Sequence, residues 1–221
     1  MEGVTKHHPT ERPHDYLPAA GRDAFLPFYD LLTAALGAAS VHRTLIAQAD
    51  LAEGQKVLEI GCGTGNLTVR VKRTHPGVDL VGSDPDPLAL ARAERKARTL
   101  KGIRFERGYA QRLPYPDGSF DRVLSTLMLH HLDHETKAAA AAEVLRVLRP
   151  GGTFYVADIA GQMSGVHGFL GRRWEKSGHL ADNHGDGIPR LLNAAGFECA
   201  EVASHRLVMG RIGYYRAVRP A

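Results

Sequence analysis

Short apolar runs alternate with longer amphipathic stretches over most of the chain. Five apolar runs have the length of buried strands, at residues 56–60, 79–83, 103–107, 120–126 and 153–159. The stretches between them carry apolar residues at helical spacing or runs of alanine, and they predict helices over residues 64–74, 87–99 and 134–148. Strands that alternate with helices are typical of parallel βαβ units, so we expect a doubly wound α/β sheet with helices on both faces.

Both ends of the chain depart from this alternation. The pattern predicts an irregular tail over residues 1–20, N-terminal helices over 21–50 and, because of its many glycines, a flap or lid insertion over 161–185. A helix over 188–195 and two strands over 197–208 and 212–218 follow. The short gap between these last strands predicts an antiparallel pair at one edge of the sheet. We expect residues 1–221 to form one domain.

The strongest chemical signal is a glycine turn, residues 61–65, which follows the first strand and contains Gly61, Gly63 and Gly65. Glycines allow a ligand to approach the backbone closely, and ligands of doubly wound sheets bind beyond the carboxyl ends of the strands. In the dinucleotide pattern the third glycine would stand one place later, where this chain has Asn66. The fit to a dinucleotide is therefore imperfect, and an NAD(P)-dependent oxidoreductase stays an alternative.

Two acidic residues near this turn point to the kind of ligand. Glu59 lies two residues before the first glycine, where its charge would repel a pyrophosphate and attract a cation. S-adenosylmethionine (SAM) carries an ammonium and a sulfonium and no phosphate, so the turn favours it. Asp84 ends the second strand, about 20 residues further on, where an acid can accept hydrogen bonds from both ribose hydroxyls. Asp84 is also placed to cap the helix that follows, and the two roles are compatible.

With these residues in view, the chain resembles the class I SAM-dependent methyltransferases of the small-molecule branch. Four stretches carry the resemblance: Glu59–Gly65, Asp84, Gly108–Asp121 and Arg146–Thr153, the last of which resembles the family's turn before the fifth strand. The resemblance implies a mostly parallel seven-stranded sheet of order 3-2-1-4-5-7-6, with strand seven antiparallel. It also implies SAM as cofactor and S-adenosylhomocysteine (SAH) as product.

The resemblance further implies a set of cofactor contacts. They come from Tyr29, Glu59, Gly61, Cys62, Gly63, Gly65, Asp84, Pro85, Ala110, Gln111, Thr126 and Leu127. Tyr29 lies in a leading segment that resembles the start of ubiquinone and menaquinone biosynthesis methyltransferases; it closes over the cofactor or belongs to the core. The chain departs from the family at Tyr109, where many members carry an Asp that holds the adenine amino group.

Methyl transfer from a sulfonium is an in-line displacement, in which orientation supplies much of the rate and no covalent protein nucleophile is needed. An oxygen or nitrogen acceptor can still require a base, for which histidine is suited. His131 follows the fourth strand, beside the expected methyl group, and is our candidate catalytic residue; a pocket wall is the alternative. Nearby His130, Asp133 and His134 leave a metal site as a third reading, although we expect none and place His134 at the start of the next helix.

Composition limits the remaining choices. The net charge is +4 and the Lys and Arg residues are scattered, with a mild cluster over Arg92–Lys101 that reads as a solvated helix face, so no nucleic-acid partner is expected. Two cysteines, Cys62 and Cys199, form neither a disulfide framework nor a four-cysteine zinc site. The chain has no apolar run of membrane-spanning length, and we expect a cytoplasmic protein.

The function predicted from the sequence is methyl transfer to a small acceptor that is partly apolar, such as a quinone, a phenol or a lipid-like compound. A SAM-binding protein without catalysis is a further alternative. The identity of the acceptor and the methylated atom stay open, and so does the oligomeric state, for which a homodimer is one option.

Overall fold

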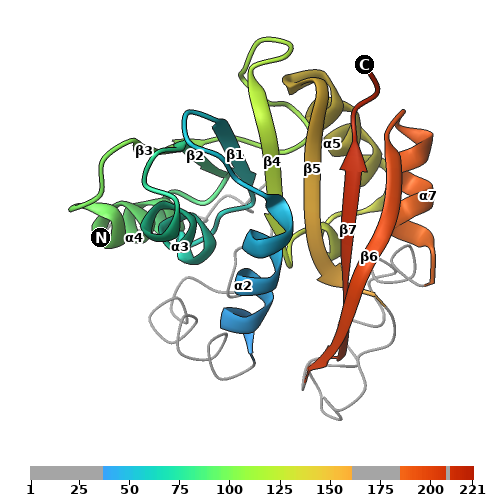
Figure 1. Ribbon diagram of the computed structural model, residues 1–221, viewed down its shortest axis with the longest axis horizontal. Helices are drawn as coiled ribbons and strands as arrows, with labels where there is room; N and C mark the ends of the chain where they lie inside the picture. Colours follow the sequence, from blue (N-terminus) through green and yellow to red (C-terminus); the bar gives the residue numbers. More distant parts are fainter. Residues whose placement is uncertain (1–36, 161–184, 208–209) are drawn as a thin grey trace, which may run out of the picture.

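Seven strands form a single mixed sheet in the computed structural model, which describes residues 37–160, 185–207 and 210–221 (Figure 1). The strands are β1 (Lys56–Ile60), β2 (Asp79–Asp84), β3 (Ile103–Arg107), β4 (Phe120–Thr126), β5 (Leu148–Ile159), β6 (Glu198–Leu207) and β7 (Gly210–Val218). Their order is β3-β2-β1-β4-β5-β7-β6, and β7 runs antiparallel to both of its neighbours. The predicted fold class and strand order are confirmed.

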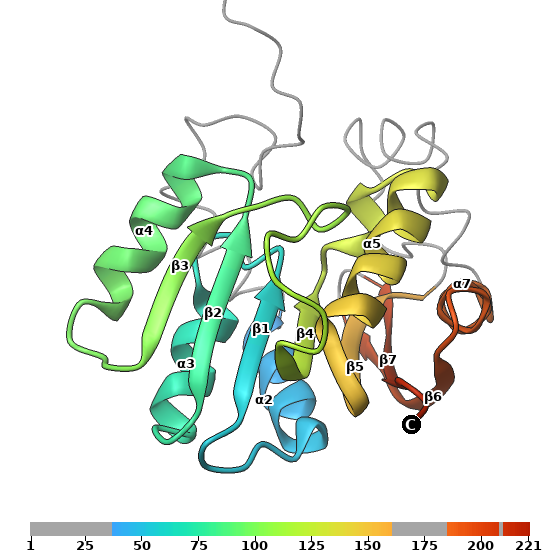
Figure 2. The same ribbon diagram turned by 90° about the horizontal axis from the view of Figure 1, so that it is seen from above.

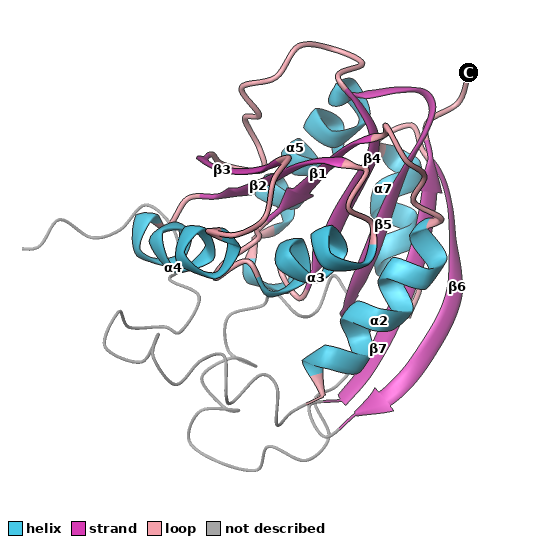
Figure 3. Cartoon of the chain, turned by 60° about the vertical axis from the view of Figure 1, so that its left-hand side comes forward, coloured by secondary structure: helices cyan, strands magenta, loops and turns pink. Residues whose placement is uncertain are grey.

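Helices cover both faces of the sheet (Figures 2 and 3). One face carries α2 (Ala38–Ala49), α3 (Asn66–Thr74) and α4 (Pro87–Ala97), and the other carries α5 (His134–Val147) and α7 (Gly187–Ala194). A short 3₁₀ turn, η2 (Leu129–His131), follows β4. The central strands are buried on both faces, which explains their continuous apolar runs. None of the helices in the described ranges is long and apolar enough to cross a bilayer.

Two hydrophobic clusters, one on each face, hold these layers together. The first joins α2 and α3 to the sheet through residues such as Leu45, Leu67 and Leu124, and the second joins α5 and α7 through Val144 and Leu192. All five side chains are almost completely buried. Because both clusters pack against the middle of the sheet, the carboxyl ends of the parallel strands are held in fixed positions relative to one another.

Two predicted boundaries are wrong. The sequence pattern places the start of the fifth strand at residue 153, after a turn within Arg146–Thr153, but β5 begins at Leu148 and pairs there with Phe120, so that Pro150-Gly151-Gly152 lies inside the strand. The backbone of Arg219 bonds to Gly151 and Gly152 from the end of the chain, and so it extends the strand past the turn signal. At the hairpin, the predicted gap is too long, since Gly210 already pairs with Leu207 as part of β7.

Several predictions fall outside the described residues. They are the irregular tail, the first of the N-terminal helices, Tyr29 and almost all of the flap at 161–185. The second N-terminal helix is present as α2.

Candidate active site

The carboxyl end of β1 continues into the glycine turn, whose three glycines are required for different reasons. Their φ angles are all positive, 66° at Gly61, 50° at Gly63 and 75° at Gly65. A Cβ on Gly61 would overlap the side chain of Met128, and one on Gly65 would lie 2.7 Å from the Cβ of Ala93. A Cβ on Gly63 would meet no atom within 4 Å. Gly61 and Gly65 therefore permit close packing, whereas Gly63 borders open space where a ligand can approach.

Asp84 is tied to the glycine turn by its carboxylate. Its Oδ2 accepts a hydrogen bond from the Gly63 N–H at 2.8 Å, and its Oδ1 accepts one from the Asp86 N–H at 2.9 Å. The cap of α4 is Asp86, which accepts from the N–H groups of Leu88 and Ala89. The capping role considered for Asp84 therefore belongs to Asp86, and Asp84 is left to face the turn.

Burial raises the pKa of Asp84, and the backbone donors at Asp86 and Gly63 only partly oppose that rise. Glu59, at the end of β1, is buried more deeply, with 1% of its surface exposed. Burial raises the pKa of Glu59 to about 8, although the Thr68 hydroxyl donates a hydrogen bond to its carboxylate. Within the described part of the chain, neither acid forms an ion pair with a Lys, Arg or His side chain.

Cys62 and Pro85, both predicted contact residues, have structural partners. The Cys62 N–H donates to the carbonyl of Ser83 at 3.1 Å, and this bond joins the glycine turn to β2. Its thiol is buried and lies where Gly82 leaves room for it. The carbonyl of Pro85 accepts a hydrogen bond from Nε of Arg107 on β3 at 3.1 Å. This geometry gives Cys62 a packing role between the glycine turn and β2.

The stretch Gly108–Asp121, one of the four that carry the family resemblance, begins with a tight turn after β3. Tyr109 forms an isolated bridge with Arg112, which leaves Ala110 half-buried and Gln111 exposed between them. Leu113, directly after this turn, donates its N–H to Oε2 of Glu143 on α5 at 2.8 Å.

Arg146 of α5 fixes the rest of this loop. Its guanidinium donates to the carbonyls of Leu113 and Tyr115 at 3.0 and 2.7 Å and also pairs with Asp117. In the sequence, Arg146 could be assigned only to the turn before the fifth strand. The structure shows that it anchors the loop after β3 to α5.

The backbone after β4 leaves the sheet through an unusual conformation. Thr126 is the last residue of β4, and Leu127 has a φ of 51°, a left-handed conformation that costs a non-glycine residue free energy. The Leu127 N–H still donates to the carbonyl of Ala157 at 2.8 Å. This bend turns the chain toward the glycine turn, so that Met128 packs over Gly61.

A buried histidine–aspartate pair lies next to this bend and was missed by sequence reasoning. His130 Nδ1 is 2.6 Å from Oδ1 of Asp158, which sits near the carboxyl end of β5. Burial would raise the pKa of Asp158, but the nearby His130 and the N–H of Ile159 outweigh it, and the pKa is lowered. The ring of His131 lies 4.1 Å from that of His130, tilted by 38°, and is less buried. The candidate base therefore belongs to a group of three side chains.

The other polar residues of this segment begin the next helix. Asp133 accepts the N–H of Thr136 and caps α5, and His134 is the first residue of that helix, as predicted. Among the described residues, no three His, Cys, Asp or Glu side chains gather in a way that could hold a metal ion.

The strand ends thus bring together most of the predicted cofactor residues. Glu59 and the glycine turn come from β1, Asp84 from β2, Thr126 and Leu127 from β4, and the histidine–aspartate pair from β4 and β5. Ala110 and Gln111 stand in the turn after β3.

Comparison with known proteins identifies the family. Residues 57–152 match a family model described as a methyltransferase domain. The chain is 38% identical over 151 residues to the demethylmenaquinone methyltransferase of Deinococcus radiodurans, covering 66% of this chain and 61% of that protein. It is 35% identical over 151 residues to the protein of the same name from Thermus thermophilus, covering 66% of this chain and 67% of that protein.

Solved structures extend the likeness to almost the whole fold. The crystal structure of the [4+2]-cyclase SpnF matches with a TM-score of 0.71 at 20% identity, over 93% of this chain and 98% of that one. At this identity the match shows the fold alone. The sequence relatives and the sheet order together confirm the predicted family, enzyme class and cofactor. The chain belongs to the class I SAM-dependent methyltransferases.

Proposed function

We propose that this protein transfers a methyl group from SAM to a small, partly apolar acceptor that gives up a proton. One observation carries the proposal: two buried carboxyl groups, Glu59 and Asp84, flank an open glycine turn and have no cationic partner among the described residues. This arrangement suits a ligand that brings its own positive charge and a ribose. When bound, SAM supplies a methyl group that is already activated on a sulfonium.

The residues around the turn have separate tasks in this proposal. Asp84 accepts two backbone N–H groups, and each of its oxygens retains a lone pair for a ribose hydroxyl. Glu59 provides a negative charge once a cation lies nearby and favours its ionised form. Gly63 presents backbone without a side chain to the methionine part of the ligand. Loop residues Ala110 and Gln111, held through Arg146, border the adenine.

The histidine group handles the proton of the acceptor. His131 is the less buried of the two histidines, so we assign it to the acceptor side as the base. Asp158 stays ionised, because its pKa is lowered, and it holds His130 through Nδ1. A carboxylate in this position orients an imidazole and stabilises its protonated form. His130 and Asp158 are therefore positioning residues for His131.

The names of two relatives support one class of acceptor. Two relatives with 38% and 35% identity, each over 151 residues, are named demethylmenaquinone methyltransferases. A quinol or phenol ring, whose hydroxyl can give up a proton and so become a nucleophile, is the acceptor class that agrees with these names and with a histidine base.

Calorimetric titration with SAH and with NADH tests the cofactor part, and turnover of SAM over a panel of quinols, phenols and lipids tests the transfer. We expect SAH to bind, NADH not to bind, and a quinol or phenol to be methylated. Binding of NADH without SAH would overturn the proposal, and SAH binding with no turnover on any acceptor would favour a SAM-binding protein without catalysis. Full turnover of His131→Ala across the neutral pH range would remove His131 as the base.

A further inference from the structure

Positive charge is concentrated on one helix of this protein and the loop that follows it. Residues 87–101 contain five Lys or Arg residues and a single acid, Glu94. The net charge of this segment is therefore +4, the same as that of the whole chain. The rest of the chain is therefore neutral overall. Such an asymmetry points to an anionic partner for this segment.

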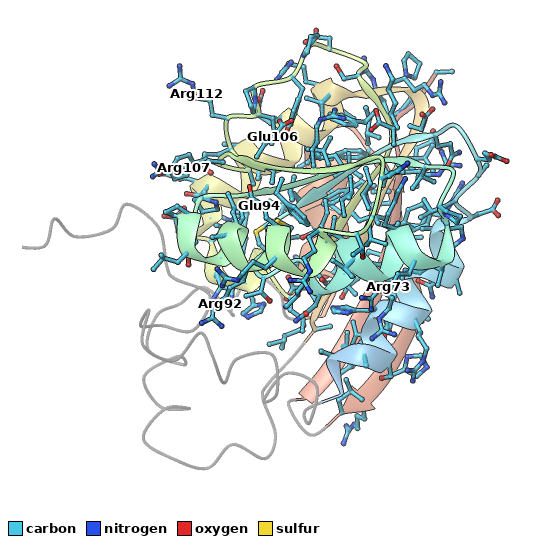
Figure 4. All side chains as sticks on the ribbon, turned by 90° about the vertical axis from the view of Figure 1, so that its left-hand side faces the viewer. Arg73, Arg92, Glu94, Glu106, Arg107 and Arg112 are labelled. Carbon is cyan, nitrogen blue, oxygen red and sulfur yellow. The ribbon has the colours of Figure 1, made fainter. Side chains whose placement is uncertain are left out.

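Four of these cations face outward from α4 and its loop. Arg95, Arg98 and Lys101 are exposed and Arg92 is partly exposed, and no acid in the described part of the chain pairs with any of them. The fifth cation, Lys96, is engaged internally, since it donates to Thr64 and Asn66. Figure 4 shows Arg92, and Arg107 from neighbouring β3, extending away from the ribbon. We call Leu88, Arg92, Arg95, Arg98, Lys101 and Arg107 the α4 basic face.

An exposed apolar residue distinguishes this face from a purely electrostatic one. Leu88, in the first turn of α4, is 49% exposed and is one of only two exposed large hydrophobic residues in the described part of the chain. Helical spacing of four and seven residues places Arg92 and Arg95 on the same side as Leu88. An apolar side chain among cations is the arrangement with which helices bind the surface of an anionic bilayer.

The same face lacks the features of a nucleic-acid site. The aromatic residue of β3, Phe105, is half-buried, and its ring packs against Gly82 and Gly65. No aromatic residue occurs within 87–101, so bases would have nothing to stack on.

We propose that the α4 basic face docks this protein onto an anionic lipid bilayer, with the arginines and Lys101 on the headgroups and Leu88 in the apolar layer. Leu88 stands only four residues after Asp84, and Arg107 bonds to Pro85, so a docked bilayer lies beside the mouth of the cofactor site. An apolar acceptor can then reach the site from the membrane. The docking itself depends on no step of the proposed methyl transfer.

Co-sedimentation with phosphatidylcholine vesicles, with and without phosphatidylglycerol, tests the docking in the absence of SAM and acceptor. We expect binding only to the anionic vesicles, and less of it at high salt. The triple variant Arg95→Gln/Arg98→Gln/Lys101→Gln should bind at least about tenfold more weakly, since each basic residue near an anionic surface contributes to attraction.

A matched variant separates this face from net charge. Arg43→Gln/Arg206→Gln/Arg216→Gln removes the same number of charges from exposed positions on α2, β6 and β7 and should bind like the unchanged protein. An equal loss in both triple variants would overturn the proposal. The proposal would also be overturned if the protein did not bind anionic vesicles but bound a DNA duplex through the same arginines. Leu88→Ser should weaken vesicle binding and leave any affinity for DNA unchanged.

Discussion

On the β1–β2 side of the site, Glu59 and Asp84 are buried carboxyl groups whose pKa values are raised by that burial. On the β4–β5 side, Asp158 is fully buried as well, yet its pKa is lowered. The backbone N–H donors do not explain this contrast, because Asp84 also accepts two of them. The difference is a histidine, since His130 lies 2.6 Å from Asp158 and no cation of the described residues pairs with the other two acids.

This contrast shows which side of the site is electrostatically complete. A buried carboxylate without a partner is costly, so a protein keeps one only where something offsets the cost. On the β4–β5 side His130 already offsets the charge of Asp158, which agrees with the proposed role of this side in proton transfer. The β1–β2 side has no cationic side chain paired with its acids among the described residues, and a cationic ligand would provide the missing positive charge.

The largest effect should come from Asp158→Asn. Removing the charge leaves the shape but deprives His130 of its orienting partner, so turnover should fall about 10²- to 10⁴-fold, the usual contribution of an acid–base group. The affinity for SAH should stay the same, because Asp158 lies on the other side of the site. Steady-state turnover and SAH titration of the same preparation separate the two effects.

Asp186→Asn is a suitable control for this variant, because Asp186 is an exposed acid in an ion pair with Arg190 on α7. It should keep full turnover. If Asp158→Asn lost SAH affinity as strongly as turnover, the division into two sides would be wrong.

Asp84→Asn should weaken cofactor binding and leave turnover nearly unchanged. An amide cannot accept from both ribose hydroxyls as a carboxylate can, and the loss of charge-assisted hydrogen bonds should weaken SAH binding roughly 100-fold. Turnover at saturating SAM should change little. The matched control is Asp79→Asn at the far end of the same strand, where Asp79 pairs with Arg104 on the surface. Equal affinities of the Asp84 and Asp79 variants would contradict the assigned ribose contact.

Most strands and helices and the glycine turn could be predicted from sequence because their signals are local, whereas the order of the strands followed only from the family resemblance. Apolar runs, helical spacing and three close glycines are visible without knowing what lies next to them. The start of β5 could not be predicted, since Leu148 is held in the strand by pairing with Phe120, and Gly151 by Arg219 at the end of the chain. A Pro-Gly-Gly signal indicates a turn, and tertiary pairing overrode it.

The same limit applies to the site. Asp158 is one acid in an apolar strand, and its histidine partner is 28 residues away, so no spacing rule connects them. Asp84 and Asp86 stand two residues apart and either could cap α4; the direction of the backbone donors decides it. Sequence reasoning therefore found the residues that share a motif and missed those that meet only in the folded chain.

A smaller effect concerns the stability of the ligand-free protein. Because the pKa of Glu59 rises to about 8 on folding, its neutral form favours the folded state, and that contribution is lost as pH rises from the ordinary value of 4.5 toward 8. Glu59→Gln mimics the neutral form at every pH. Its free energy of unfolding, relative to the unchanged protein, should therefore improve by about 2–3 kcal/mol between mildly acidic and mildly basic pH.

Urea unfolding of both proteins at the two pH values measures this difference. Other titrating groups affect both proteins alike and cancel. A relative stability that does not depend on pH would mean that Glu59 is ionised in the folded protein without its ligand.

The smallest effect is also the most direct test of the proposed cationic ligand. If the ammonium or sulfonium of SAM lies near Glu59, binding lowers the pKa of Glu59 and expels its proton, so SAM should bind up to about tenfold more tightly as pH rises toward 8. Calorimetry in buffers of different ionisation heats counts the protons released. SAH lacks the sulfonium charge and should show a smaller change, and Glu59→Gln should abolish the part due to this residue. An identical pH dependence for both ligands and both proteins would contradict a positive charge near Glu59. Another group that titrates in this range, such as a histidine, would then cause the pH dependence.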